Sequence, residues 1–93
     1  MTSRKEHSVV TFTVYILRTS SNTIYIGQTN NLDKRLKEHK SKTTRSAKYM
    51  KYFDSFELVY TEVYGTRTEA LQREWQLKQL TRKQKDALIN KHY

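Results

Sequence analysis

Three short runs of β-branched and aromatic residues predict three strands. They cover residues 11–18 (TFTVYILR), 23–28 (TIYIGQ) and 56–64 (FELVYTEVY). Such residues favour the pleated, half-buried surface of a sheet. Only residues 19–22 (TSSN), which are typical of turns, separate the first two runs. We therefore expect these two strands to form an antiparallel hairpin.

The other segments have apolar residues at the three- and four-residue spacing of helices. Leu32 and Leu36 are four residues apart and follow residues 30–31 (NN), either of which can cap a helix. Residues 66–69 (TRTE) and 81–84 (TRKQ) each fit a capping box and predict two more helices. The apolar residues of these two helices are Ala70, Leu71 and Leu77, which we place on one face, and then Ala87 and Leu88.

The predicted element order is β-β-α-β-α-α, an α+β domain whose three-stranded antiparallel sheet is flanked by helices. The 93 residues suffice for one domain, which we place at residues 9–93 after a short flexible segment at residues 1–8. That segment (MTSRKEHS) is charged and lacks the apolar stretch of a secretory signal. The chain also has no cysteine and no apolar run of about 18 residues that could span a membrane. We expect a cytoplasmic protein.

The charge of the chain indicates the class of its partner. There are 18 lysine and arginine residues against 9 acidic ones, a formal net charge of +9 at pH 7. Such an excess favours polyanions, because each neutralised phosphate releases condensed counterions. The densest basic stretch, residues 34–51, also contains aromatic residues that can stack on bases. Its candidate nucleic-acid-binding residues are Lys34, Lys37, Lys40, Lys42, Arg45 and Lys48. The alternative is an ordinary basic surface that keeps the protein soluble.

Polar residues interrupt the apolar face of the first predicted helix. At about 100° per residue, His39 falls on the stripe of Leu32 and Leu36, and Arg35 falls at its edge. His39 is consistent either with a core histidine whose hydrogen bonds are satisfied or with a functional group. Arg35 is consistent with a phosphate contact or with plain solvation.

Glu74 interrupts the next helix in the same way, because it falls between Ala70 and Leu77 on the apolar face. An unpaired buried carboxylate costs several kcal/mol, so we expect Glu74 to have a cation, a hydrogen-bond network or a metal as its partner. A structural salt bridge with Arg35 or Arg73 and a role as metal ligand are both open.

Two tyrosines lie on consecutive predicted strands. Tyr25 precedes Gly27, and a strand glycine often marks a close approach of another group. Side chains alternate along a strand, so Tyr15 and Tyr25 share a face only if paired positions sum to an even number. We expect Tyr15 opposite Tyr25, with residues 19–21 as the loop.

Taken together, these residues resemble the GIY-YIG nuclease family, as a small single-domain member of the bacterial type. The two signatures of the family stand here as residues 13–15 (TVY), which retain only the tyrosine, and residues 25–27 (YIG), which are intact. Residues 28–39 (QTNNLDKRLKEH) look like its arginine- and histidine-bearing helix. Residues 57–60 (ELVY) and 69–78 (EALQREWQLK) look like its third strand and its glutamate-bearing helix.

The resemblance implies a metal-dependent endonuclease that hydrolyses DNA phosphodiester bonds, structure-selective or single-strand-preferring, of the repair and recombination type. It assigns catalysis to Tyr15, Tyr25, Arg35, His39 and Glu74 and predicts that all five converge on one cleft. Glu74 would hold Mg²⁺ or Mn²⁺, cations that need few carboxylates. Tyr15 is the first candidate for general base, assisted by Tyr25 or His39. Arg35 and the cation would lower the pKa of its phenol from about 10, and Arg35 would also clamp the scissile phosphate.

Two other classes of function remain open. A basic nucleic-acid-binding module without catalysis explains the charge, but it has no need for Glu74. A scaffold that contacts an acidic protein explains the charge but not the polar residues on the apolar helix faces. If the protein is a nuclease, we expect it to be a monomer that binds DNA, with RNA as the alternative substrate. We expect no membrane binding, and a partner protein that supplies targeting.

Overall fold

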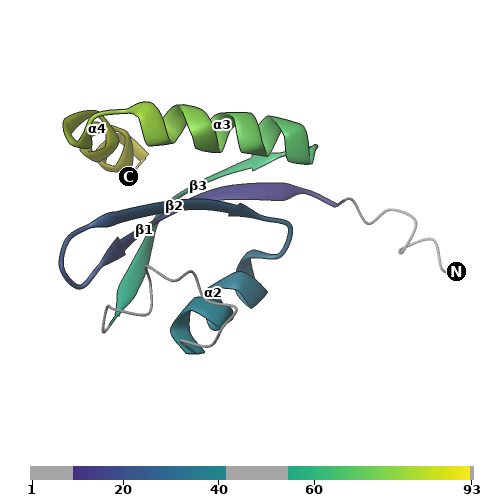
Figure 1. Ribbon diagram of the computed structural model, residues 1–93, viewed down its shortest axis with the longest axis horizontal. Coiled ribbons are helices and arrows are strands. Elements are labelled where there is room, and N and C mark those ends of the chain that lie inside the picture. Colours follow the sequence, from purple (N-terminus) through teal and green to yellow (C-terminus); the bar gives the residue numbers. More distant parts are fainter. Residues whose placement is uncertain (1–9, 42–54, 93) are drawn as a thin grey trace, which may run out of the picture.

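The computed structural model describes residues 10–41 and 55–92, in which helices cover both faces of a small sheet (Figure 1). The elements are β1 (Phe12–Thr19), β2 (Ile24–Thr29), α2 (Leu32–Ser41), β3 (Phe56–Tyr64), α3 (Arg67–Gln79) and α4 (Arg82–His92). The predicted order β-β-α-β-α-α and the α+β class are therefore confirmed. The flexible segment predicted at residues 1–8 lies outside the described residues.

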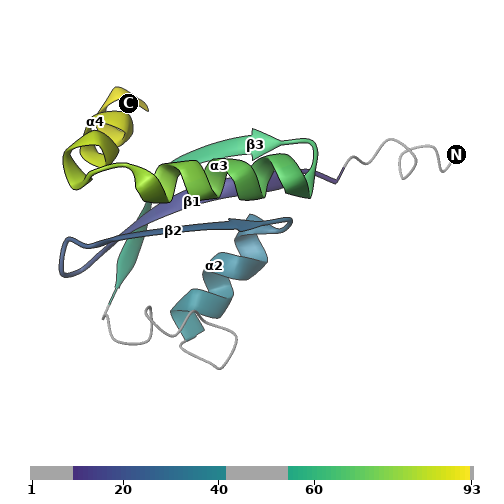
Figure 2. The same ribbon diagram turned by 45° about the horizontal axis from the view of Figure 1, so that its top comes forward.

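The sheet is antiparallel with the order β2-β1-β3, so β1 is central and β2 is an edge strand. In both views α3 and α4 lie on one face of the sheet and α2 lies on the other (Figures 1 and 2). Among the described residues, no helix is long and apolar enough to cross a membrane.

Alternate residues of β1 enter two separate cores. Val14 and Ile16 pack with Ala70, Leu77 and Ile89 on the face of α3 and α4. On the other face, Tyr15 and Leu17 form a second cluster. Its partly buried members are Tyr25, Leu32, Leu36 and Phe56. Because helices cover both faces of β1, its residues 14–17 are all buried. This one strand therefore contributes side chains to the cores on both faces of the sheet.

The register of the β1–β2 hairpin differs from the predicted one by two residues. Tyr15 pairs with Gly27, and Leu17 pairs with Tyr25. The expected pairing of Tyr15 with Tyr25 is therefore wrong. The sum of paired positions is still even, so both tyrosines lie on one face, as predicted, with ring centroids 6.2 Å apart.

The loop of the hairpin explains the shift. The amide of Thr19 donates to the carbonyl of Thr23 at 2.9 Å, so the loop is residues 20–22 and not residues 19–21. Asn22 has φ 62, a left-handed conformation that asparagine tolerates better than most residues, and its amide donates to the Thr19 carbonyl at 2.8 Å. A left-handed residue at the third loop position is a common way to close a three-residue hairpin.

The predicted helix caps are present. Asn31 caps α2, because its Oδ1 accepts from the amide of Lys34 at 3.1 Å. Thr66 caps α3 by accepting from the amide of Glu69 at 3.2 Å. Before α4, Thr81 and Gln84 form a reciprocal pair in which each side chain accepts from the amide of the other, at 3.1 and 2.9 Å. Side-chain oxygens thus accept hydrogen bonds from first-turn amides, which have no backbone acceptor within the helix.

Two of the apolar residues that mark the predicted helices are on the surface. Leu71 is 46% exposed, because it lies about 100° around α3 from the buried Ala70. Ala87 is exposed, and α4 contributes the buried Ile89 and the partly buried Leu88 to the core.

Candidate functional site

A hydrogen bond between β1 and α2 forms the centre of the candidate site. Tyr15 Oη lies 3.0 Å from His39 Nε2, and both side chains are almost completely buried. Gly27, the cross-strand neighbour of Tyr15, makes room for this phenol. A Cβ at Gly27 would lie 2.7 Å from Tyr15 Oη and 2.9 Å from its Cζ. The glycine of the intact signature is therefore required, because any side chain at position 27 would displace the Tyr15 phenol.

Tyr25 completes an aromatic cluster around the hydrogen bond. Its ring centroid lies 5.4 Å from that of His39, with the rings edge to face, and the Tyr15 and His39 centroids are 6.1 Å apart. The ring centroid of Phe56, on β3, lies 6.1 Å from that of His39, also edge to face. The His39 ring is thus held by residues from all three strands.

Arg35 lies one turn before His39 on α2. Its Nη1 donates to Glu38 Oε1 at 3.0 Å, and the guanidinium also interacts with the phenols of Tyr15 and Tyr25. Its side chain remains 26% exposed. The structure therefore brings Tyr15, Tyr25, Arg35 and His39 together. The guanidinium of Arg35 lies where this cluster meets the surface.

The surroundings keep both hydrogen-bonded groups neutral near pH 7. Burial, and then the neighbouring Tyr25, raise the pKa of Tyr15, while Arg35 acts in the opposite direction. Arg35 thus lowers the phenol pKa, as expected, but burial outweighs Arg35 alone and leaves the pKa above its ordinary value. Burial, and next the charge of Arg35, lower the pKa of His39 to about 4. A neutral phenol thus faces a neutral imidazole.

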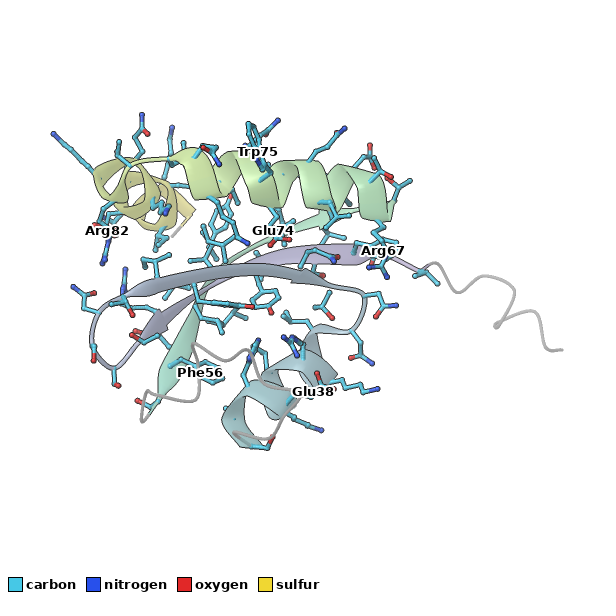
Figure 3. The ribbon with its side chains drawn as sticks, viewed as in Figure 1. Glu38, Phe56, Arg67, Glu74, Trp75 and Arg82 are labelled. Carbon is cyan, nitrogen blue, oxygen red and sulfur yellow. The ribbon has the colours of Figure 1, made fainter. Side chains whose placement is uncertain are left out.

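Glu74 lies on α3, on the opposite face of the sheet from α2. Its side chain is 17% exposed, and its Oε2 pairs with Lys78 Nζ at 2.7 Å. Figure 3 shows Glu74 directed from α3 towards the sheet. The prediction of a compensating cation for this carboxylate is confirmed, but the expected partners are wrong. Arg73 pairs with Glu62, and Arg35 pairs with Glu38.

A hollow at the edge of the sheet lies between β2 and the helices α3 and α4. This β2-edge hollow measures about 310 Å³, and its lining residues are Ile24, Tyr25, Ile26, Lys78 and Lys85. Tyr25 belongs to the aromatic cluster, and Lys78 is the partner of Glu74. The convergence of all five predicted residues on one cleft stays a prediction. Lys78 escaped the sequence analysis, although its position four residues after Glu74 was a signal for the pair.

Only part of the predicted basic patch falls on described residues. Lys34, Lys37 and Lys40 are exposed on α2, on the layer of Tyr15 and His39. The other predicted members of the patch, Lys42, Arg45 and Lys48, lie outside the described residues.

The described residues fit a divalent cation that is held by few protein ligands. They contain no group of three or more histidine, cysteine, aspartate or glutamate side chains that could hold a metal. Mg²⁺ often uses one or two carboxylates together with substrate phosphates, and Glu74 can supply one. Gln28 Oε1 is buried without a hydrogen-bond partner, and Gln28 pairs with Val14, whose side chain faces α3. This face therefore offers a carboxylate and an unsatisfied amide oxygen.

Comparison with known proteins identifies the family. The model of the GIY-YIG catalytic domain matches residues 11–87. The chain belongs to the GIY-YIG catalytic-domain family, which is a family of nucleases. The two signature tyrosines, Tyr15 and Tyr25, meet beside His39 as described above.

Similar proteins carry a UPF0213 name. A UPF0213 protein of Oceanobacillus iheyensis is 42% identical over 76 residues, which are 82% of this chain and 86% of that protein. The UPF0213 protein YazA of Bacillus subtilis is 40% identical over 75 residues, 81% of this chain and 74% of its own. The solution NMR structure of a UPF0213 protein from Bacillus halodurans is also similar, with a TM-score of 0.56 and 34% sequence identity. That match covers 86% of this chain and 83% of the other.

Proposed function

We propose that this GIY-YIG protein is a metal-dependent endonuclease that hydrolyses phosphodiester bonds in DNA and prefers branched or single-stranded substrates of repair and recombination. The observation that carries the proposal is the buried hydrogen bond between Tyr15 and His39 beside Gly27, with Arg35 at its open end. A protein that only binds nucleic acid gains nothing from a buried phenol–imidazole pair next to a cation. Phosphodiester hydrolysis can use such a pair, because water must lose a proton as it attacks.

The neutral state of the pair suggests how Tyr15 acts. A free phenolate is costly in this pocket, because burial raises the Tyr15 pKa. Tyr15 can instead pass its own proton to His39 Nε2 while its oxygen accepts one from the attacking water. The low pKa of His39 makes it a weak acceptor, and the charge of Arg35 is the second cause of that low value. A phosphate bound to Arg35 offsets this charge, so substrate binding itself would make His39 more basic.

Glu74 and Lys78 serve the other face of the site. In the free protein, the ammonium compensates a carboxylate that would otherwise be buried and unpaired. Glu74 would hold Mg²⁺ or Mn²⁺, which when bound neutralises charge on the phosphate and activates water. Lys78, 51% exposed, is then free to contact a phosphate.

The substitution Glu74→Gln tests this function, because it removes the carboxylate and keeps the shape of the side chain. We expect the cleavage rate with Mg²⁺ or Mn²⁺ to fall by about 10²–10³, a usual cost for losing one group that stabilises transition-state charge. Binding to DNA should stay equal or tighten, because a negative charge near the phosphates is lost. The assay uses single-stranded, duplex, flap and junction DNA, with and without the cations.

The matched control is Glu57→Gln, which removes the same charge from an exposed position on β3. Melting temperatures of all three proteins show whether each variant is folded. If Glu74→Gln folds normally and cuts at the wild-type rate, the catalytic proposal is wrong. If the wild type binds DNA but cuts none of the four substrates with either cation, the chain is a binding module.

A further inference from the structure

A large apolar side chain stands exposed on α3 beside the Glu74–Lys78 pair. Trp75, the only tryptophan of the chain, is 65% exposed, and Leu71 is 46% exposed. In Figure 3, Trp75 points away from the sheet while its neighbour Glu74 points towards it. Trp75 and Leu71 line a hollow of about 570 Å³, here named the Trp75 hollow, together with Gln72 and Gln76.

A second hollow joins this surface to the candidate catalytic glutamate. The Glu74 hollow measures about 220 Å³, and its lining residues are Leu71, Glu74, Trp75 and Lys78. Leu71 and Trp75 therefore border both hollows. The two hollows therefore adjoin, and a ligand seated against the indole would lie next to the hollow that Glu74 and Lys78 line.

The chemistry of the two hollows differs in a way that matches a nucleotide. The Trp75 hollow has an aromatic surface and two uncharged amides, Gln72 and Gln76. A nucleobase has flat apolar faces and a hydrogen-bonding edge, and glutamine amides are common partners of base edges. The charged groups, Glu74 and Lys78, lie in the adjoining hollow, where a phosphate would reach them.

Charge also favours nucleic acid over a second copy of this protein. Each chain carries a formal net charge of +9, so two copies repel each other, whereas a strand of phosphates is attracted.

We propose that Trp75 is a stacking platform for an unpaired nucleobase of the strand that is cut, with the adjoining phosphate directed to Lys78 and Glu74. This inference rests on the proposed function and adds its substrate feature, because a base within a regular duplex has no free face to offer. Single-stranded DNA, a flap or a flipped base would qualify, and an intact duplex would not.

The emission of Trp75 reports on the stacking directly, since no other tryptophan contributes. The experiment titrates the 93-residue protein with a single-stranded DNA oligonucleotide, without divalent cation so that no strand is cut. An abasic oligonucleotide of equal length has the same phosphates without the bases. We expect the first to quench the emission in step with binding, and the abasic strand and a matched duplex to quench it far less.

Substitution measures what the stacking contributes to affinity. Trp75→Ala should weaken binding of the single strand by roughly 5- to 150-fold and leave binding of the abasic strand unchanged, whereas Trp75→Phe should keep most of the affinity. The control is Val63→Ala, which removes an exposed apolar side chain from β3, 61% exposed, and should change neither. Anisotropy of a labelled oligonucleotide gives these affinities, because the alanine variant has no tryptophan.

The possible results separate this inference from the proposed function. Three results would each overturn the stacking site, even if Glu74-dependent cleavage is found. They are unchanged emission at saturation, an equal loss of affinity of Trp75→Ala for normal and abasic strands, and wild-type affinity of Trp75→Ala for the single strand. If the emission shifts with protein concentration in the absence of DNA, and sedimentation shows dimers, the surface around Trp75 binds a second copy of the protein. That result would also overturn the stacking site. Quenching that needs the bases supports the stacking site even if no cleavage is detected.

Discussion

At the scale of single residues, Gly27 and His39 constrain one phenol from two sides. Gly27 leaves the space in which the Tyr15 ring lies, and His39 Nε2 fixes its oxygen at 3.0 Å. The first signature retains only its tyrosine, residues 13–15 being TVY. Thr13 and Val14 do not enter the hydrogen bond, and Val14 faces the other core. The substituted signature therefore still positions its phenol.

The buried His39 predicts a pH dependence of stability. Its pKa is about 4 in the folded protein and about 6.5 when unfolded, so the unfolded chain binds more protons between these values. The stability that neutral His39 contributes is present above pH 6.5 and is lost as the pH falls towards 4. From pH 7 to pH 4.5, the free energy of unfolding should fall by about 2 kcal/mol more in the wild type than in His39→Gln.

Urea denaturation of both proteins at the two pH values measures this difference. The comparison cancels the other titrating groups, including the other two histidines, which the variant keeps. Equal losses in the two proteins would mean that His39 has the same pKa in the folded and unfolded states, and the lowered pKa of the buried imidazole would be disproved.

At the scale of elements, Glu62 of β3 anchors α3. Its carboxylate accepts two hydrogen bonds from Arg73, at 2.8 and 3.1 Å, and one each from the hydroxyls of Tyr60 and Tyr64. Burial alone would raise the pKa of Glu62, but hydrogen bonds from Arg73 and the tyrosines outweigh it and lower the value to about 2. Because Arg73 precedes Glu74 directly, the same contacts fix the rotation of α3 that turns Glu74 to the sheet.

Breaking this anchor should destabilise the protein. Glu62→Gln leaves the partly buried Arg73 without its counter-charge, so we expect the free energy of unfolding at pH 7 to fall by about 1–3 kcal/mol. The control Glu57→Gln, on the same strand but exposed, should change it by less than about 0.5 kcal/mol. Equal changes in the two variants would show that the four hydrogen bonds contribute nothing net. Since folded Glu62 has the lower pKa, its contribution is present above pH 4.5 and disappears as the pH falls through 2.

Local patterns predicted the elements well, because strand composition and helix caps act between near neighbours. The box at residues 81–84 is an example, since Thr81 and Gln84 satisfy each other within one turn. The hairpin register was wrong by two residues, because the left-handed Asn22 moved the loop. The pair of Glu62 and Arg73 was not predicted, because it depends on how α3 crosses the sheet.

The same distinction holds for the site. The shared face of Tyr15 and Tyr25 and the stripe that carries His39 follow from the periods of strands and helices, and both are confirmed. The exposure of Trp75 and the ion pair of Glu74 with Lys78 depend on which face of α3 is buried. The prediction placed Leu71 on the buried face, although it lies about 100° from Ala70, and so gave no indication of the surface around Trp75.

At the scale of the whole molecule, the candidate groups lie on both faces of one sheet. Tyr15, Arg35 and His39 lie on the α2 face, and Glu74 and Trp75 belong to α3 on the other. At the edge strand β2, the β2-edge hollow is lined by Tyr25, whose ring packs in the cluster on the α2 face, and by Lys78 of α3. A bound strand that passes along this edge would meet α2, the edge tyrosine and α3 in turn.

This path gives the basic residues of α2 a specific role in binding, which salt dependence can measure. The affinity for nucleic acid falls with salt in proportion to the number of phosphates neutralised, with a slope on a log–log plot of about −0.7 per contact for single strands. Lys37 and Lys40 are exposed on α2. The double reversal Lys37→Glu and Lys40→Glu should weaken binding of all sequences alike and reduce the steepness of the slope by about 1.4.

The matched control reverses Lys83 and Lys91 to glutamate. Both are exposed on α4, and their reversal changes the net charge by the same amount. If net charge alone drove binding, both double variants would lose the same slope. We expect the α4 variant to stay close to the wild type, because neither Lys83 nor Lys91 lines the β2-edge hollow along this path. Titrations of a labelled single strand between low and physiological salt distinguish these outcomes, and an affinity that does not change with salt in the wild type would disprove the electrostatic contribution altogether.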